Sequence, residues 1–197
     1  MPAEQPELIV KNARAWRAWL RKHHEDPVGV WLILAKKGTT QPTTLTYDEA
    51  LEEALCHGWI DGQTKSRDDA TYKQRFTQRR KRSPWSKRNV GKAEQLAAEG
   101  RMHQAGHAEV ERAKADGRWE AAYYGSAEIE VPPDLSAALV RDPDAQAMFN
   151  VLTKQNRYAI LYRLATAKRA ETRERLLKQF VAMLSRGETL HPQKRTR

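Results

Sequence analysis

Cysteine is nearly absent from this chain: a single residue, Cys56, occurs among 197. One thiol cannot form an intramolecular disulfide, and it cannot supply a multi-cysteine metal site. Cys56 lies in the apolar helical pattern YDEALEEALCHGW. We therefore predict a buried, inert thiol in preference to a nucleophile.

Long hydrophobic runs are also missing, since no window approaches the roughly 18 apolar residues that a membrane-spanning helix needs. The first residues, MPAEQPELIV, lack the basic and then apolar pattern of a secretory signal. We therefore predict a cytoplasmic protein without membrane insertion. Its 40% of hydrophobic residues, with six Trp, are enough to build a buried core.

Motifs that announce catalysis are absent as well. The sequence has no G-x-S-x-G, no glycine loop that would cradle phosphates and no paired catalytic carboxylates. His103 and His107 are spaced by one helical turn, but Gln104 stands where a zinc protease has glutamate, and no third ligand is nearby. We predict no catalytic residues, no cofactor and no metal.

Acidic residues are missing from residues 70–93, although the chain as a whole has 25. This segment has nine basic residues, and they account for most of the net charge of +10. They are Lys73, Arg75, Arg79, Arg80, Lys81, Arg82, Lys87, Arg88 and Lys92. Such a local excess steers an anionic partner, which could be a small molecule, an acidic surface or nucleic acid.

The first half of the chain alternates helical and strand patterns. Apolar spacing predicts a helix over residues 12–24, and a β-branched, nearly continuous apolar run predicts a central strand over 28–37. Thr46 and Glu49 form a capping box, so a helix is expected from Tyr47 to about His57.

Two short strands and a helix follow. IDGQTKS and ATYKQRFTQR read as strands joined by a turn at residues 67–69. The next helix is predicted to begin at SPWS, with Ser83 as its cap and Pro84 at its first position, and to run to Glu99.

These patterns predict an α+β fold, with a small, mainly antiparallel sheet packed with helices and a helical C-terminal part. The main domain, with its basic hairpin and helix face, is expected over residues 1–125. Residues 126–197 are expected to form a linker and the helical C-terminal region, because AEIEVPPD reads as extended and the rest as helices. The pattern does not indicate an oligomeric state.

Five segments resemble the bacterial YdeI/OmpD-associated family, also called bacteriocin-protection proteins. They are EALCHGWIDGQTK, YKQRFTQRRKRSPWSKRN, EGRM, AKADGRWEAAY and AKRAETRERLLKQFVAML, and the resemblance spans about Trp16 to Leu184. It implies a small non-enzymatic protein of stress or antimicrobial-peptide tolerance, with no established reaction or active site. Where the family usually has RFTPRR, this chain has Gln78 in place of proline.

The leading hypothesis is a ligand site on the hairpin and the following helix start. If the strands pair regularly, Asp61 and Lys65 share a face and Arg75 approaches them, ready to grip a carboxylate or phosphate. The helix start would add amide donors. The candidate residues are Trp59, Asp61, Lys65, Tyr72, Arg75, Arg79, Ser83, Trp85, Ser86 and Asn89.

Three alternatives stay open. Asp61 and Arg75 could instead form a structural ion pair above core tryptophans. The basic residues, interleaved with aromatic rings, could bind nucleic acid nonspecifically and weakly. A small enzyme would use Asp61 or His57 as acid or base, although His57, at a helix end, is expected to cap that helix as an imidazolium.

Overall fold

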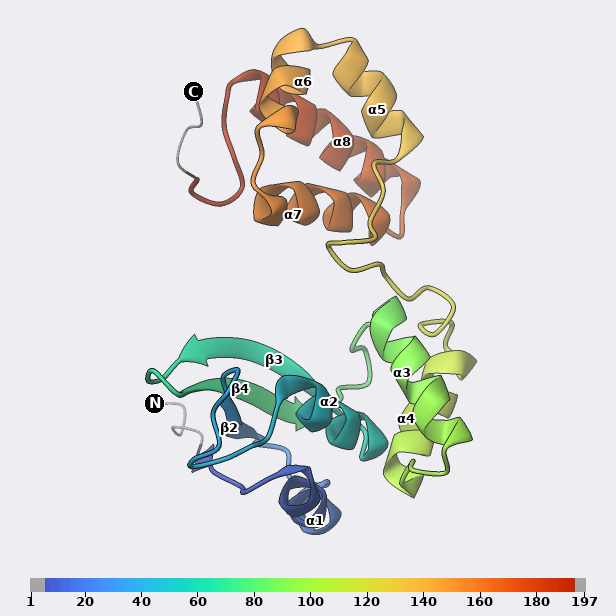
Figure 1. The fold of residues 1–197 in the computed structure, drawn as a ribbon. Coiled ribbons are helices and arrows are strands. Elements are labelled where there is room, and N and C mark those ends of the chain that lie inside the picture. Colours follow the sequence, from blue (N-terminus) through green and yellow to red (C-terminus); the bar gives the residue numbers. More distant parts are fainter. Residues whose placement is uncertain (1–5, 194–197) are drawn as a thin grey trace. The chain divides into compact units, whose positions relative to one another are not determined.

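The computed structural model describes residues 6–193, and the chain divides into two compact units between Ala122 and Tyr123 (Figure 1). The sequence places this boundary three residues later, after Gly125. Within the described residues, the N-terminal unit holds a four-stranded sheet with helices, and the C-terminal unit is helical. The predicted α+β class is confirmed.

The N-terminal unit has four strands and four helices among its described residues. In chain order they are β1 (Glu7–Leu8), α1 (Ala13–His23), β2 (Val30–Ala35), α2 (Tyr47–Cys56), β3 (Trp59–Ser66), β4 (Thr71–Gln78), α3 (Lys87–Ala98) and α4 (Gln104–Ala115). The order in the sheet is β1-β2-β4-β3, with β1 parallel to β2 and the other pairs antiparallel.

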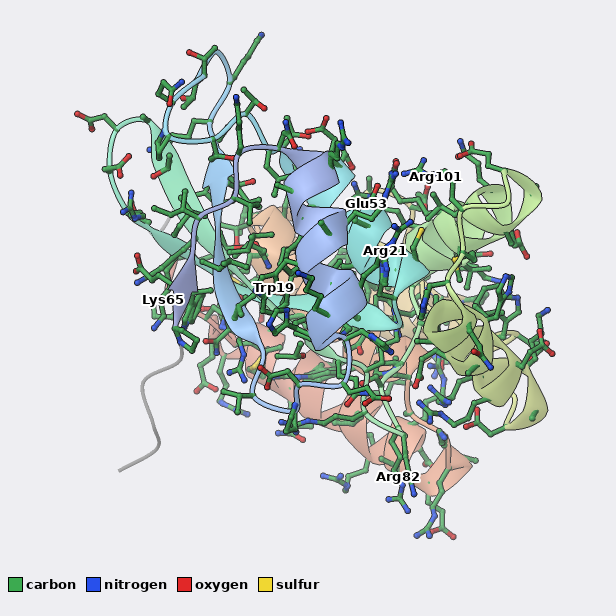
Figure 2. The ribbon with its side chains drawn as sticks, turned by 90° about the horizontal axis from the view of Figure 1, so that it is seen from below. Trp19, Arg21, Glu53, Lys65, Arg82 and Arg101 are labelled. Carbon is green, nitrogen blue, oxygen red and sulfur yellow. The ribbon has the colours of Figure 1, made fainter. Side chains whose placement is uncertain are left out.

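Helices α1 and α2 cover one face of this sheet, which we call the helical face (Figure 1, and Figure 2 from the side of α1). Leu32 and Phe76 point from β2 and β4 into a core with Trp16 of α1 and Ala54 of α2. Both predicted helix starts are confirmed: Asn12 caps α1 and the Thr46 capping box starts α2. Cys56 is buried, as predicted, and this burial raises the pKa of its thiol to about 11.

The opposite face, here called the second face, is formed by the alternate residues of the strands. Trp31 and Ile33 of β2 point to it and belong to neither core of this unit, whereas Leu32 and Leu34 belong to the helical face. In β4, Lys73 and Arg75 lie on the second face, since each pairs in register with one of these β2 residues.

A β-bulge changes the expected register of the hairpin. Asp61 pairs with Phe76 and Thr64 with Gln74, so three steps along β3 match two steps along β4. One extra residue reverses the side-chain alternation. The prediction that Asp61 and Lys65 share a face is therefore wrong: Asp61 lies on the helical face and Lys65 on the second face.

The start of α3 also differs from the prediction. Ser86, not Ser83, is the N-cap, and its hydroxyl accepts a hydrogen bond from the Asn89 amide at 3.2 Å. Pro84 consequently stays outside the helix, in the turn that precedes it. Trp85, which is only 2% exposed, enters a core made by α2, α3 and α4, so its burial fixes the chain before the helix begins.

The C-terminal unit contains α5 (Pro133–Val140), α6 (Pro143–Asn150), α7 (Lys154–Ala165) and α8 (Ala170–Ser185). Its core gathers Leu139, Phe149, Ile160 and Phe180 from these four helices. Among the described residues of the whole chain, no helix combines the length and apolar character that a membrane span requires.

Candidate anion-binding face of the sheet

The acid-free run does not form one basic surface, because α2 neutralises the part that folds into α3. Arg88 lies 2.5 Å from Asp48, and Lys92 lies 3.0 Å from Glu52 and 3.7 Å from Asp48. The acids that balance these cations come from an element about 40 residues earlier. A charge count along the sequence therefore overstates the charge that a ligand would meet.

Arg79 is removed from the surface altogether. Its side chain is buried, its guanidinium lies 3.6 Å from the centre of the Trp85 ring, and it donates a hydrogen bond to the Pro84 carbonyl at 3.2 Å. Trp85 in turn meets Trp119 edge to face, with ring centres 4.8 Å apart. We interpret Arg79 as part of the packing of this core.

Three cations, Arg80, Lys81 and Arg82, lie exposed in the turn after β4 and form no ion pair with a described acid. Figure 2 shows Arg82 projecting well away from Lys65, which marks the second face. This turn adds charge to the surface, and of the predicted site it contains Ser83, whose hydroxyl is engaged by the Arg80 amide.

The remaining cations gather on the second face. Arg75 lies directly opposite Trp31, and Lys73 lies opposite both Ile33 on one side and Lys65 on the other. The Lys65 ammonium stands 4.7 Å from the centre of the Trp31 ring, and that of Lys73 stands 5.7 Å from it. Two ammonium groups thus lie near one indole, and Arg75 is its neighbour across the strands.

Arg75 is the group on this face whose bonding is incomplete. Its Nε is buried and donates no hydrogen bond to any described residue. The bulge places Gly62 beside it, and a Cβ at that glycine would lie 3.7 Å from the Arg75 Cβ. Gly62 therefore places no side chain next to the arginine.

The acid on this face is already engaged. Glu7 of β1 lies 2.5 Å from Lys73 and 3.4 Å from Arg67. The hydrogen bond from Lys73 holds the pKa of Glu7 below its usual value, with the Arg67 charge adding to the effect. Glu7 therefore balances Lys73, and Arg75 has no acidic partner among residues 6–193.

Asp61 does not meet Arg75, so neither an orienting contact nor a structural ion pair joins them. On the helical face its carboxylate accepts a hydrogen bond from the Tyr47 hydroxyl at 2.9 Å. Burial, together with the Asp61 charge, raises the pKa of Tyr47 well above its usual range. Tyr72 also packs on this face, against the core shared with α1.

The other predicted residues serve the fold. Trp59 is fully buried and donates from its indole N–H to the His24 carbonyl at 2.7 Å. Ser83 accepts from the Arg80 amide at 3.0 Å, and Asn89 is buried in the first turn of α3. Of the ten candidates, the second face brings together Lys65 and Arg75.

Sequence reasoning missed Lys73 and Trp31 as members of this face. Both lie in strands that were predicted, but their meeting depends on the pairing of β2 with β4, which the sequence pattern did not reveal. Polar and apolar residues do not alternate along β2, because its residues are almost all apolar. The sequence therefore does not show which of them lie on which face.

A histidine cluster was also missed. The rings of His24, His57 and His103 lie at the ends of three helices, with centres 5.0 to 6.5 Å apart. His57 bonds the Glu53 carbonyl through Nδ1 at 2.9 Å, as predicted for a cap, but burial lowers its pKa, which disfavours the expected imidazolium.

His103 caps α4 instead of pairing with His107, because its Nδ1 accepts from the Ala105 amide at 3.2 Å. Within residues 6–193, no group of three or more His, Cys, Asp or Glu is arranged to hold a metal ion.

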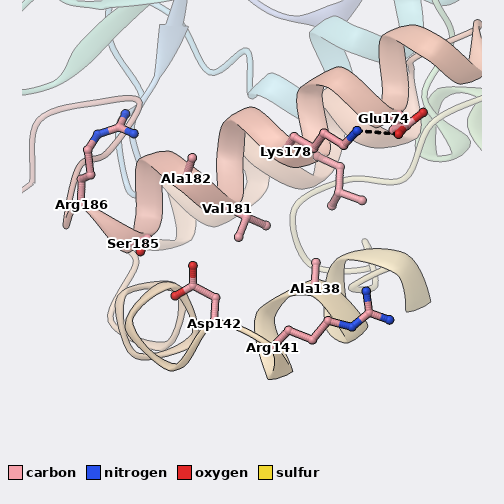
Figure 3. A pocket seen from close by; sticks show the side chains of 10 residues that line it. Ala138, Arg141, Asp142, Glu174, Lys178, Val181, Ala182, Ser185 and Arg186 are labelled. Carbon is pink, nitrogen blue, oxygen red and sulfur yellow. Dashed lines mark hydrogen bonds and ion pairs between the residues drawn. The ribbon is translucent and has the colours of Figure 1, made fainter.

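The C-terminal unit has a concave surface of a different kind, a groove of about 660 Å³ between α8 and the corner of α5 and α6 (Figure 3). Its lining includes apolar side chains such as Ala138, Leu177 and Val181. Two of its charged residues are balanced nearby: Lys178 lies 2.7 Å from Glu174, and Arg186 lies 2.9 Å from Glu188.

The two units define an α+β protein in which a small sheet with one cationic face precedes a separate helical unit. Residues 8–109 match the family described as a domain of unknown function (DUF8412), and residues 128–187 match the family described as Bacteriocin-protection, YdeI or OmpD-Associated. The chain belongs to the DUF8412 family, and its C-terminal unit is a YdeI/OmpD-associated domain.

The YdeI/OmpD-associated match is confined to the C-terminal unit, whereas the resemblance in sequence motifs was expected to begin near Trp16. Motifs such as GWIDGQTK fall within the DUF8412 match instead. No curated protein and no solved structure matches the chain.

Proposed function

We propose that this protein is a binding protein that captures an anionic ligand on the second face of its N-terminal sheet, and that it acts in stress or bacteriocin tolerance. The observation that carries the proposal is Arg75, whose buried Nε lacks a hydrogen-bond acceptor among the described residues. Arg75 also has no acidic partner among the described residues, and a carboxylate or phosphate would accept charge-assisted hydrogen bonds from its guanidinium.

Lys65 supports this assignment because it adds positive charge on the same face, next to Lys73, whose charge Glu7 balances. The two lysine stems and the Trp31 ring hold the site in a partly desolvated surface, where a charge-assisted hydrogen bond is stronger than in bulk water. The role in tolerance is supported by the description of the family matched by the C-terminal unit.

Binding is favoured over catalysis because the two groups that an enzyme would use are engaged in the fold. Asp61 accepts from Tyr47, and His57, which is only 4% exposed, bonds the Glu53 carbonyl through Nδ1. Neither group lies on the second face with Arg75.

The test compares Arg75→Ala with Arg80→Ala, which removes an exposed arginine of the neighbouring turn and serves as the matched control. A thermal-shift screen against inorganic phosphate and small carboxylates, at low and high salt, should show stabilisation of wild type and Arg80→Ala that is lost in Arg75→Ala. Equal shifts for the two folded variants would refute an Arg75-centred site.

Nonspecific nucleic-acid binding is the second candidate, favoured by the three exposed cations at residues 80–82. It predicts affinity that falls steeply with salt and that declines by a similar step for each removed cation, Arg80 and Arg75 alike. The same pair of variants therefore separates a site with one dominant residue from a diffuse basic surface.

A further inference from the structure

Trp31 stands apart from the other tryptophans of this chain. Trp16, Trp59, Trp85 and Trp119 belong to the cores of the N-terminal unit, and Trp19 packs against one of them. Trp31 is only 9% exposed, yet it belongs to neither of the two core clusters of this unit. The ammonium groups of Lys65 and Lys73 lie close to its ring.

The position of Trp31 relative to Arg75 is fixed by the sheet. The two residues are directly opposed in the β2–β4 register, which places their side chains next to each other on the second face. A ligand whose phosphate reaches Arg75 would therefore have the indole as the neighbouring surface. On the other side of Arg75 lies Gly62, which offers no side chain to a ligand.

A ligand could replace the contact between Lys65 and the Trp31 ring. Lys65 is exposed, and its contact with the ring is a cation–π interaction, which is weak at a solvated site. Stacking of a nucleic-acid base on an aromatic ring is stronger than such a contact. A base could therefore displace the lysine, whose ammonium would then be free to approach the phosphate.

From this juxtaposition we infer that the anion bound by the second face is a nucleoside phosphate, with its phosphate on Arg75 and its base on Trp31. The inference rests on the proposed function and names its ligand class. The same chemistry is presented by a free nucleotide and by a single strand, so the experiment includes both.

The experiment is calorimetric titration of the full chain with adenosine monophosphate and with ribose 5-phosphate, which carries the phosphate and sugar without the base. Wild type should bind the nucleotide about ten-fold more tightly than the sugar phosphate, as expected for one stacked base. Trp31→Leu should abolish this difference and leave the affinity for ribose 5-phosphate unchanged, whereas Trp31→Phe should retain most of it.

Arg75→Ala tests the anion site separately from base stacking on Trp31. This variant should lower the affinity for both ligands, whereas Arg80→Ala should leave both affinities unchanged. Equal affinity of wild type for the two ligands, with loss of both in Arg75→Ala, would overturn the base-stacking inference and leave the anion site standing. An Arg75→Ala variant that is folded by circular dichroism and binds both ligands as wild type does would overturn the proposed function as well.

A third ligand, a ten-residue oligothymidylate, distinguishes the source of the nucleotide. Tighter binding than to the mononucleotide, with a steep dependence on salt and a loss in Trp31→Leu, would assign a single strand to the face. Equal or weaker binding would assign a free nucleotide. Oligonucleotide binding that is unaffected by Trp31→Leu and reduced by Arg80→Ala would overturn the inference. It would show that the oligonucleotide binds to the exposed turn at residues 80–82.

Discussion

The second face of the sheet and the α2–α3 contact receive their cations from the same acid-free segment, yet the two regions differ in what they offer a ligand. On α3, Arg88 and Lys92 are balanced by Asp48 and Glu52 of α2. On β4, Arg75 has no acidic partner among the described residues. The comparison teaches that a run of positive charge stays available to a ligand only where the fold brings no opposite charge to it.

The physical reason lies in the secondary structure. A helix presents residues three and four apart to one neighbour, so α2 can place its acids along the cations of α3. A strand alternates its side chains between two faces, and Lys73 and Arg75 are carried to the face away from α2. The proposed site therefore lies on the face that the acids of α2 do not reach.

The largest expected effect comes from Glu53→Ala, which removes the most buried acidic residue of α2. Glu53 is 2% exposed and is bonded by Arg17 at 2.7 and 2.5 Å and by Arg101 at 3.2 Å (Figure 2). We expect the free energy of unfolding to fall by about 2–3 kcal/mol in urea titrations, because charged hydrogen bonds are lost.

Glu99→Ala is the control for Glu53→Ala. Glu99 pairs with the same Arg101 at 3.2 Å, but it is exposed, so its loss should cost much less than that of Glu53. Similar losses in the two variants would contradict the distinction between buried and exposed acids of this network.

Asp48→Asn combined with Glu52→Gln should convert α3 into a cationic surface. Freed of their partners, Arg88 and Lys92 should raise the affinity for a single-stranded oligonucleotide up to about ten-fold at low salt, and make the salt dependence of binding steeper. The affinity for inorganic phosphate at Arg75 should stay unchanged. Binding measured across a salt series checks this, and unchanged oligonucleotide affinity would show that α3 is not neutralised by α2.

Ser86→Ala tests what holds the first turn of α3 in place. The cap bond from the Asn89 amide is lost, so the free energy of unfolding should fall by about 1 kcal/mol. Ser83→Ala, which removes the hydroxyl that the sequence pattern predicted as the cap, should cost less because Ser83 bonds only a turn amide at 3.0 Å. Chemical denaturation of both variants decides between them, and a larger loss in Ser83→Ala would reverse the assignment.

The smallest effect concerns pH. His57 has a pKa below its ordinary value of 6.5, because burial and the neighbouring His103 and His24 disfavour its charged form. As pH falls below about 6.5, the unfolded chain binds a proton before the folded one does, so the stabilisation present above that pH is progressively lost.

We expect the free energy of unfolding of the wild type to decline more than that of His57→Gln between about pH 7.5 and about pH 5.5. Urea titrations at several pH values measure the two slopes. Parallel slopes would show that His57 does not contribute. Protonation of His57 in acid would also add positive charge at the end of α2, so the charge difference between α2 and the second face would become smaller.

Many elements were predictable because their signals are local. The caps Asn12 and Thr46 and the helical spacing that follows them fix α1 and α2 within a few residues. The α3 start was misplaced by three residues because Ser83 and Ser86 offer the same hydroxyl, and only the burial of Trp85 before the helix chooses between them.

The candidate site was predictable in part. Arg75 and Lys65 were named from residue type alone, since arginine and lysine in an acid-free hairpin indicate an anionic partner. Asp61 was added to them on the assumption of a regular register. The bulge between Asp61 and Thr64 invalidates that assumption, and nothing but the Gly62 within the strand hints at it in the sequence.

By itself the sequence determined the secondary structure, the α+β class, the buried cysteine and the excess of positive charge, because each depends on neighbours along the chain. Only the tertiary structure decided where that charge stays uncompensated. Pairing of β2 with β4 sets Trp31 beside Arg75, and packing of α2 on α3 neutralises Arg88 and Lys92. These contacts join residues about 40 positions apart, and a charge or an aromatic ring acquires its chemical role from such neighbours in space.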